Sequence, residues 1–259
     1  MGARDVKFRS TPLVRTSVVG VVVPAHNEQS LLAEALRSLV DAFGELSRWD
    51  VSLKAAIVLD ACTDDSEEIA REWQHNLARD RSFIDVTIVI CHAKNVGYAR
   101  GLGCSTLLAQ SSRFSPSEVW LATTDADSRV PRDWLSTQVI QHEVGVDHWL
   151  GRVAVADWSE HRSDTRAWWQ NEYEEEIHPI HGTSLGFNGA AYLAVGGFAP
   201  LKTGEDRALN LALVAHGART HYDSAIRVVT SARRRARAPL GFAHALDVIN
   251  TALLVRTTS

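Results

Sequence analysis

The sequence has few cysteines, no long apolar run and little net charge, and each shortage excludes a class of protein. Three cysteines in 259 residues match no zinc-ligand spacing and cannot all pair, which argues against a disulfide scaffold and favours a reducing compartment. No apolar run approaches the roughly 20 residues that span a bilayer. A net charge of −4 lacks the positive field that nucleic-acid binding needs. We therefore expect a cytoplasmic enzyme or binding protein with no transmembrane segment and no nucleic-acid partner.

The most apolar stretch, Val18–Val23, is too short for the core of a signal peptide and runs directly into Pro24. We interpret it as a buried strand. The composition, 45% apolar and 22% charged, is ordinary for a globular protein. A chain of this length can bury one large core or two small ones.

Strand-like and helix-like segments alternate along the first half of the chain. Strand patterns cover 18–23, 51–59 and 86–91, and each precedes a helical pattern, at 31–43, 66–78 and 97–109. This alternation predicts an α/β fold: a single Rossmann-like, doubly wound domain with a mostly parallel central sheet. We divide it into an N-terminal arm (1–17), a first half (18–135), a second half (136–239) and a C-terminal helix and tail (240–259).

Two carboxylates, Asp125 and Asp127, follow the apolar run 119–122. In an extended segment, residues two apart project on one side, so both carboxylates are expected to converge just past the strand's carboxyl end. Open α/β sheets bind their ligands there. A divalent ion that holds a diphosphate is the usual partner of such a pair. A simple turn is the alternative, because Asp favours turns.

Polar residues also follow the three earlier strands. Asn27 is predicted to cap the first helix, and the carboxylate of Asp60 to face the same crevice as Asp125. Gly97 would let a ligand approach the backbone closely. Lys94 and Arg100 carry charge suited to a diphosphate, or are solvated surface residues.

These features together, Pro24-Ala25-His26-Asn27-Glu28, Asp60, Lys94-Asn95-x-Gly97 and Asp125-Ala126-Asp127, resemble the family 2 glycosyltransferases of the GT-A fold. The resemblance is best over 18–135. It implies a site for a nucleotide-diphosphate sugar of the UDP or GDP type. It also implies Mg²⁺ or Mn²⁺ bound by Asp127 and Asp125, with His221 as a candidate third ligand. The implied nucleotide-sugar contacts are Pro24, Ala25, His26, Glu28, Asp60, Lys94, Gly97, Asp125 and Ala126.

The second half contains aromatic and histidine residues of open role. A helix is predicted at 163–176, and its Trp168-Trp169 pair is interpreted as core, with a sugar-stacking platform as the alternative. The small-residue segment from His181-Gly182 to Gly196-Gly197-Phe198 resembles the part of the family that lies beneath donor sugar and acceptor. His181 and Gly182 are therefore candidates for acceptor or phosphate contacts.

Glu205 and Asp206 open a strong helical pattern. Favourable interaction with the helix dipole would explain both carboxylates. The resemblance instead implies that Asp206 is the catalytic base and Glu205 supports it or contacts sugar. Such a base would deprotonate the acceptor hydroxyl in an inverting displacement.

Four arginines crowd positions 233–237, and a helical pattern spans 240–255. Arg233 and Arg235 are candidates for contact with the donor diphosphate or an acidic acceptor, and a solvated loop is the alternative. An anionic membrane surface is a weaker alternative, which would make the protein peripheral at the inner membrane face. The helical segment is expected to pack on the domain.

The sequence thus favours a metal-dependent inverting glycosyltransferase with a small-molecule, glycan or lipid-linked acceptor, in a chain that could form a homodimer. A nucleotidyltransferase is the enzyme alternative, although its usual Gly-rich basic loop is missing after the first strand. A non-catalytic sugar-nucleotide-binding protein is the second alternative, against which Asp125, Asp127 and Asp206 argue.

Overall fold

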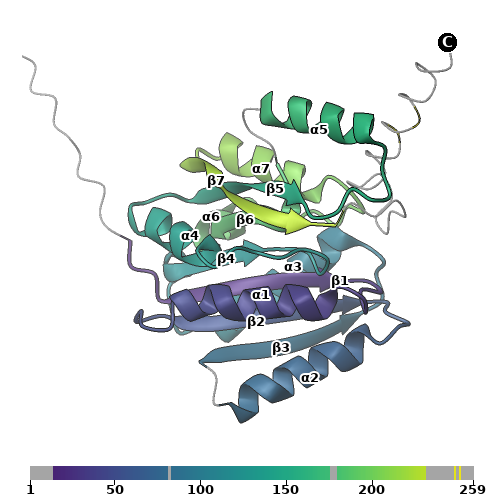
Figure 1. Ribbon diagram of the computed structural model, residues 1–259. Helices are drawn as coiled ribbons and strands as arrows, with labels where there is room; N and C mark the ends of the chain where they lie inside the picture. The colour runs from purple at the N-terminus through teal and green to yellow at the C-terminus, as the bar shows by residue number, and fades with distance from the viewer. Residues whose placement is uncertain (1–13, 81–82, 176–179, 232–247, 249–250, 252–259) are drawn as a thin grey trace, which may run out of the picture.

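The structure is a computed structural model that describes residues 14–80, 83–175, 180–231, 248 and 251. Its centre is a seven-stranded sheet with the strand order β3-β2-β1-β4-β6-β5-β7 (Figure 1). The strands are β1 (Val18–Ala25), β2 (Ser52–Asp60), β3 (Ile84–Cys91), β4 (Val119–Thr123), β5 (His148–Val155), β6 (Leu185–Asn188) and β7 (Thr220–Thr230).

Most neighbouring strands of this sheet run parallel. β1 pairs with β2 and β4, β2 pairs with β3, and β5 pairs with β7, all in parallel. Among the strands of the described residues, β6 alone is antiparallel, to both β4 and β5. The predicted α/β, mostly parallel, doubly wound sheet is confirmed.

Seven α-helices are found in the described residues, and they cover both faces of the sheet (Figure 1). Two short 3₁₀ turns, Pro116–Glu118 and Gly182–Ser184, precede β4 and β6. The α-helices are α1 (Leu32–Glu45), α2 (Ser66–Arg79), α3 (Val96–Gln110), α4 (Trp134–Glu143), α5 (Ser163–Glu175), α6 (Gly189–Ala194) and α7 (Glu205–Ala215).

The apolar pattern of β1 explains the two cores. Val19, Val21 and Val23 face the core shared with α1 and α4, whereas Val18 and Val22 face the core shared with α3, α6 and α7. A strand buried on both faces is apolar throughout, as this one is. Burial of each such side chain contributes about 1.5–3 kcal/mol relative to exposure.

Two local predictions are wrong. Asn27 does not cap α1, which begins at Leu32; Asn27 instead has a φ of 56° and accepts a hydrogen bond of 2.7 Å from the backbone N–H of Thr63. Its amide therefore joins the turns after β1 and β2. Thr16 and Ser17 were assigned to an N-terminal arm outside the domain, but both are buried, and the hydroxyl of Thr16 contacts Nδ1 of His142 at 2.9 Å.

Candidate functional site

The sheet brings the predicted nucleotide-sugar residues of its first two strands together at one edge. Pro24 and Ala25 end β1 beside Val58 and Leu59 of β2. The next residue, His26, contacts the backbone oxygen of Asp60 through Nδ1 at 2.6 Å. The turns after β1 and β2 are thus one connected surface.

Glu28 and Asp60 are both buried within these turns. The backbone N–H of Glu28 donates to Oγ of Ser66 at 2.7 Å. The carboxylate of Asp60 accepts hydrogen bonds from the backbone N–H groups of Lys94 and Asn95, at 2.8 and 2.7 Å. Asp60 therefore fixes the turn after β3 in place, and its carboxylate faces this turn instead of the crevice that we expected.

The role predicted for Gly97 also changes. A Cβ at this position would lie 2.2 Å from the backbone oxygen of Ala199, and the N–H of Gly97 donates to the oxygen of Leu201 at 3.0 Å. Glycine is required here because the segment 199–201 packs against α3. The close approach is made by the protein's own backbone.

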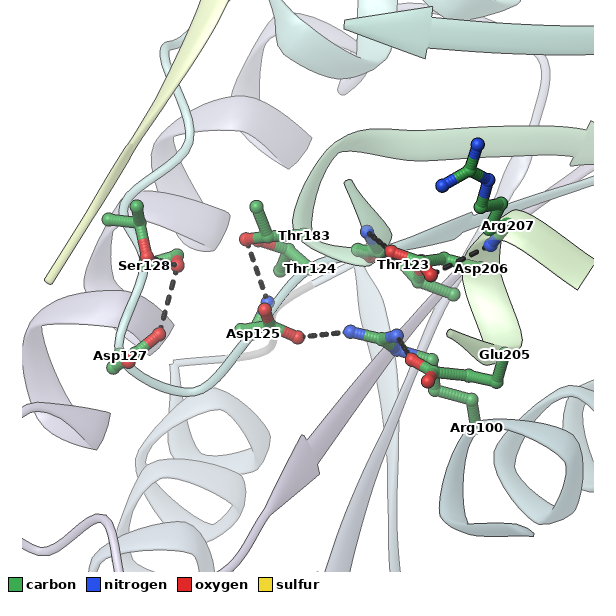
Figure 2. Close-up of polar contacts among 12 residues, drawn as sticks. Arg100, Thr123, Thr124, Asp125, Asp127, Ser128, Thr183, Glu205, Asp206 and Arg207 are labelled. Carbon is green, nitrogen blue, oxygen red and sulfur yellow. Dashed lines mark hydrogen bonds and ion pairs between the residues drawn. The ribbon is translucent and has the colours of Figure 1, made fainter. Parts of the chain in front are cut away.

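Asp125 and Asp127 lie on a turn that follows β4. The N–H of Ser128 donates to the backbone oxygen of Asp125 at 3.1 Å, which closes the turn around the buried Ala126. The carboxylate of Asp125 points toward Arg100, whereas Asp127 accepts from Oγ of Ser128 at 3.0 Å (Figure 2). The predicted convergence of the two carboxylates is wrong because a turn does not have the two-residue repeat of a strand.

Arg100 is the hub of the site. Its side chain is only 4% exposed, and it forms ion pairs with the carboxylates of Asp125 and Glu205 (Figure 2). Burial alone would lower the pKa of Arg100, but these carboxylates raise it overall. The guanidinium therefore stays charged and binds the D-x-D turn to the first turn of α7.

The pKa of Glu205 is raised, because burial outweighs the opposing effect of Arg100. Two roles were considered for Arg100 from the sequence: the solvated surface residue is wrong because the side chain is 4% exposed, and the diphosphate contact stays a prediction. Its neighbours Gly97, Ala99, Gly103 and Cys104 are all buried residues of α3. A single arginine on a helix face of small residues is the sequence signal for a buried ion pair.

Asp206 lies beside this hub. Its Oδ2 accepts a hydrogen bond of 2.8 Å from the N–H of Gly182, and its Oδ1 accepts one of 2.7 Å from the N–H of Arg207. The backbone oxygen of Gly182 in turn accepts a 2.6 Å hydrogen bond from the hydroxyl of Thr123, the last residue of β4. Thr123 was not identified from the sequence.

The Asp206 carboxylate is therefore oriented by the backbone of the segment before β6. His181 precedes Gly182, and burial lowers its pKa to about 4, although the charges of Asp206 and Asp125 act in the opposite direction. The imidazole is neutral at pH 7. The contact with phosphate or acceptor that was considered for His181 would therefore be a hydrogen bond from a neutral ring, and it stays a prediction.

A cleft of about 250 Å³ lies beside Asp127. Its walls come from the start of α1, the D-x-D turn, the loop after β5 and the end of β7. Its charged lining residues are Glu34, Asp127, Arg129, Asp157 and Glu160.

Within the described residues, no group of three or more His, Cys, Asp or Glu side chains is arranged to hold a metal ion. His221 does not supply a ligand beside Asp127. It pairs in register with Trp149, whereas Thr230, which contacts Ser128, pairs with Val155 at the other end of β5. Six residues of strand separate those positions, about 20 Å.

The remaining predictions fall partly outside the described residues. Arg233 and Arg235 lie there, as does nearly all of the helical segment 240–255. Among the helices that the structure describes, none has both the length and the apolar character needed to cross a bilayer.

Comparison with known proteins identifies the class. The model of the family described as glycosyl transferase family 2 matches residues 20–199, more than half of the chain. The protein belongs to this family and is a glycosyltransferase of the GT-A fold. No curated protein matches the sequence.

Solved structures of low sequence identity share the fold. Mannosyltransferase PcManGT from Pyrobaculum calidifontis, in complex with GDP-Man and Mn²⁺, has a TM-score of 0.59 and 19% identity over 95% of this chain and 68% of that one. S. aureus TarS, in complex with UDP, has a TM-score of 0.57 and 14% sequence identity over 91% of this chain and 70% of that one. Glucosyl-3-phosphoglycerate synthase from Mycobacterium tuberculosis, in complex with Mg²⁺ and UDP, has a TM-score of 0.53 and 16% sequence identity over 93% of this chain and 79% of that one.

Proposed function

We propose that the protein transfers a sugar from a nucleoside-diphosphate donor to an acceptor hydroxyl in a metal-dependent, inverting reaction. One observation carries the proposal: Arg100 joins Asp125 of the D-x-D turn to Glu205, the neighbour of Asp206. The residues predicted for donor and acceptor chemistry therefore lie in one connected site at the edge of the sheet where parallel α/β folds bind ligands.

The donor half is assigned to the turns after β1, β2 and β3. Pro24 and Ala25 lead into His26, whose ring contacts the backbone of Asp60, and the turn that the Asp60 carboxylate holds carries the exposed Lys94. The structural neighbours bind UDP, or GDP-Man with Mn²⁺, which supports a UDP or GDP donor.

The residues fit a divalent cation that is shared with the donor. Asp127 lies in the acidic cleft, whereas the carboxylate of Asp125 is occupied by Arg100. Mg²⁺ is commonly held by one or two carboxylates together with substrate phosphates, so Asp127 and a donor diphosphate are a sufficient ligand set. When bound, the cation would neutralise the negative charge of the departing nucleoside diphosphate.

Asp206 is assigned as the general base. Its carboxylate takes the proton of the acceptor hydroxyl, and that oxygen attacks the anomeric carbon while the bond to the diphosphate oxygen breaks. The N–H of Gly182 fixes Oδ2 of Asp206 at 2.8 Å, so the base is oriented before the acceptor arrives. A single displacement inverts the anomeric centre.

The two alternatives are now less favoured. Membership in glycosyl transferase family 2 argues against a nucleotidyltransferase, which would release pyrophosphate from a nucleoside triphosphate. A non-catalytic binding protein has no need of an oriented Asp206. The homodimer, the lipid-linked acceptor and association with the inner membrane face stay predictions.

Asp206→Asn tests the assignment. We expect donor binding to persist, measured as the rise in melting temperature with UDP or GDP and Mn²⁺, while turnover of donor falls about 100-fold or more. Asp133→Asn, an exposed carboxylate that precedes α4, is the matched control. Undiminished turnover in Asp206→Asn would place the base elsewhere.

A further inference from the structure

Four rings form a row above the second half of the sheet. Trp158 and Trp169 have ring centroids 5.7 Å apart, Trp169 stacks on Tyr173 at 4.3 Å with an interplanar angle of 13°, and Tyr173 lies 5.5 Å from His181. We call Trp158, Trp169, Tyr173 and His181 the aromatic row. Trp169 and Tyr173 come from one face of α5, because residues four apart in a helix are neighbours.

The two ends of the aromatic row adjoin segments with different proposed roles, metal binding at one end and base catalysis at the other. Trp158 belongs to the loop whose residues Asp157, Ser159 and Glu160 line the cleft of Asp127. His181, at the other end, precedes Gly182, whose N–H orients Asp206. The row therefore extends from the proposed metal carboxylate toward the proposed base.

Tyr173 is buried, but Trp158 and Trp169 belong to neither of the two apolar clusters of the described residues. Polar groups lie against it: the guanidinium of Arg152 is 4.6 Å from the centre of the Tyr173 ring. The hydroxyl of Tyr173 accepts a 2.8 Å hydrogen bond from the N–H of Val153, so this ring is fixed to β5. Trp158 and Trp169 remain half-exposed.

The cleft beside the row is rich in hydrogen-bonding groups. Carboxylates are provided by Glu34, Asp157 and Glu160, and hydroxyls by Ser159, Thr230 and Ser231. Carboxylates accept hydrogen bonds from sugar hydroxyls, and the apolar faces of sugar rings stack on aromatic side chains. Glu34 is paired with Arg129, but Asp157 and Glu160 repel an acceptor phosphate or carboxylate that carries no cation, whereas the donor diphosphate is proposed to bind together with Mg²⁺ or Mn²⁺.

We infer that the aromatic row and the adjoining cleft wall form the acceptor site for a neutral saccharide, whose hydroxyl is presented to Asp206 while its rings contact Trp158 and Trp169. This inference rests on the proposed function. It makes Trp158 and Trp169 an acceptor platform, the alternative that the sequence left open for Trp169, with the buried Tyr173 as their support.

The test compares adjacent tryptophans of α5. Trp169→Ala and Trp158→Ala are measured against Trp168→Ala, which removes an exposed indole outside the aromatic row. The probes are neutral di- and trisaccharides of glucose, mannose, galactose and N-acetylglucosamine, and the same sugars bearing a phosphate. Binding is measured with UDP or GDP and Mn²⁺ present.

We expect at least one neutral saccharide to bind the wild-type protein and to serve as an acceptor. Trp169→Ala and Trp158→Ala should each weaken its binding and raise the acceptor KM about tenfold. Both variants should still show a rise in melting temperature with nucleotide, which demonstrates that they are folded. Trp168→Ala should behave as the wild type, and Trp169→Phe, which keeps a ring, should retain most of the binding.

The inference is overturned if no neutral saccharide binds, if phosphorylated sugars bind better, or if both row variants bind as tightly as the wild type. Should Trp169→Ala fail to fold, Trp158→Ala and Trp169→Phe decide the question. If the wild-type protein shows no rise in melting temperature with nucleotide, the proposed function itself is refuted. The two failures are thus distinguishable.

Discussion

Arg100 and Glu205, 105 positions apart in the chain, form a buried ion pair in which both side chains are about 5% exposed or less. The same guanidinium holds Asp125. One cation therefore pairs with two carboxylates that lie on different elements. The geometry of the D-x-D turn and of α7 depends on it.

Removal of this cation is expected to leave a buried carboxylate without a partner. Arg100→Met should lower the free energy of unfolding by about 3–5 kcal/mol, as loss of one partner of a buried pair does. Glu205→Gln in the same chain should restore part of that loss, because no buried charge then remains at this pair. Urea denaturation of both single variants and the double variant measures the coupling. Additive effects would show that the pair is not coupled.

Arg100→Lys should not rescue activity. An ammonium group keeps the charge but lacks the planar fork that contacts two carboxylates at once. We expect a higher melting temperature than in Arg100→Met and a turnover still reduced relative to the wild type. Wild-type turnover in the lysine variant would mean that charge alone is sufficient.

Gly182 is expected to accept no side chain. A Cβ there would lie 2.0 Å from Nη1 of Arg100, a buried side chain whose two terminal nitrogens are each paired with a carboxylate. Gly182→Ala should destabilise the protein by about 1–3 kcal/mol and lower turnover, since the N–H that orients Asp206 would shift. Gly101→Ala in α3 is the matched control, with its nearest contact at 3.7 Å. The control should gain about 0.5–1 kcal/mol in thermal unfolding.

Metal binding is expected to depend on the nucleotide. Because no group of three or more His, Cys, Asp or Glu side chains in the described residues is arranged to hold a metal ion, Mn²⁺ alone should shift the melting temperature little. Mn²⁺ with a nucleoside diphosphate should shift it strongly, by about 2.7 kcal/mol of stabilisation at 100 times the Kd. Asp127→Ala should abolish the part of the shift that requires metal. An equal shift in wild type and variant would refute the metal role of Asp127.

Stability is expected to fall in mild acid. Burial lowers the pKa of His142 from 6.5 to about 4, and the pKa values of His148 and His181 fall to about 4 for the same reason. Between pH 4 and pH 6.5 the unfolded chain therefore binds more protons than the folded protein does. The stabilisation is complete above pH 6.5 and is lost progressively as the pH falls toward 4. The loss for His142 alone is roughly 3 kcal/mol.

His142→Gln checks the assignment in urea denaturation at pH 7, 5.5 and 4.5. Nε2 of His142 lies 2.8 Å from Nδ2 of Asn188, which can only donate, so the imidazole must be neutral for this hydrogen bond. The variant should show a shallower dependence of stability on pH. The exposed His216→Gln variant is the matched control. An unchanged slope in His142→Gln would contradict the proposed origin of the acid sensitivity.

The sequence by itself determined the layers of the fold and the edge at which the site lies. Alternating strand and helix patterns predicted the parallel sheet, because hydrophobic periodicity is a local property of the chain. The positions of Asp60 and Asp125 at strand ends were predicted in the same way. The order of these features was sufficient to indicate the family.

Only the tertiary structure decided which polar groups meet. Asp60 turned to the backbone of Lys94 and Asn95, and Arg100 joined carboxylates 25 and 105 positions away. A sequence pattern does not contain these pairings, because a buried charge takes the partner that packing brings within reach, however distant it is along the chain. For the same reason, the divergence of Asp125 and Asp127 followed from one backbone hydrogen bond that closed a turn.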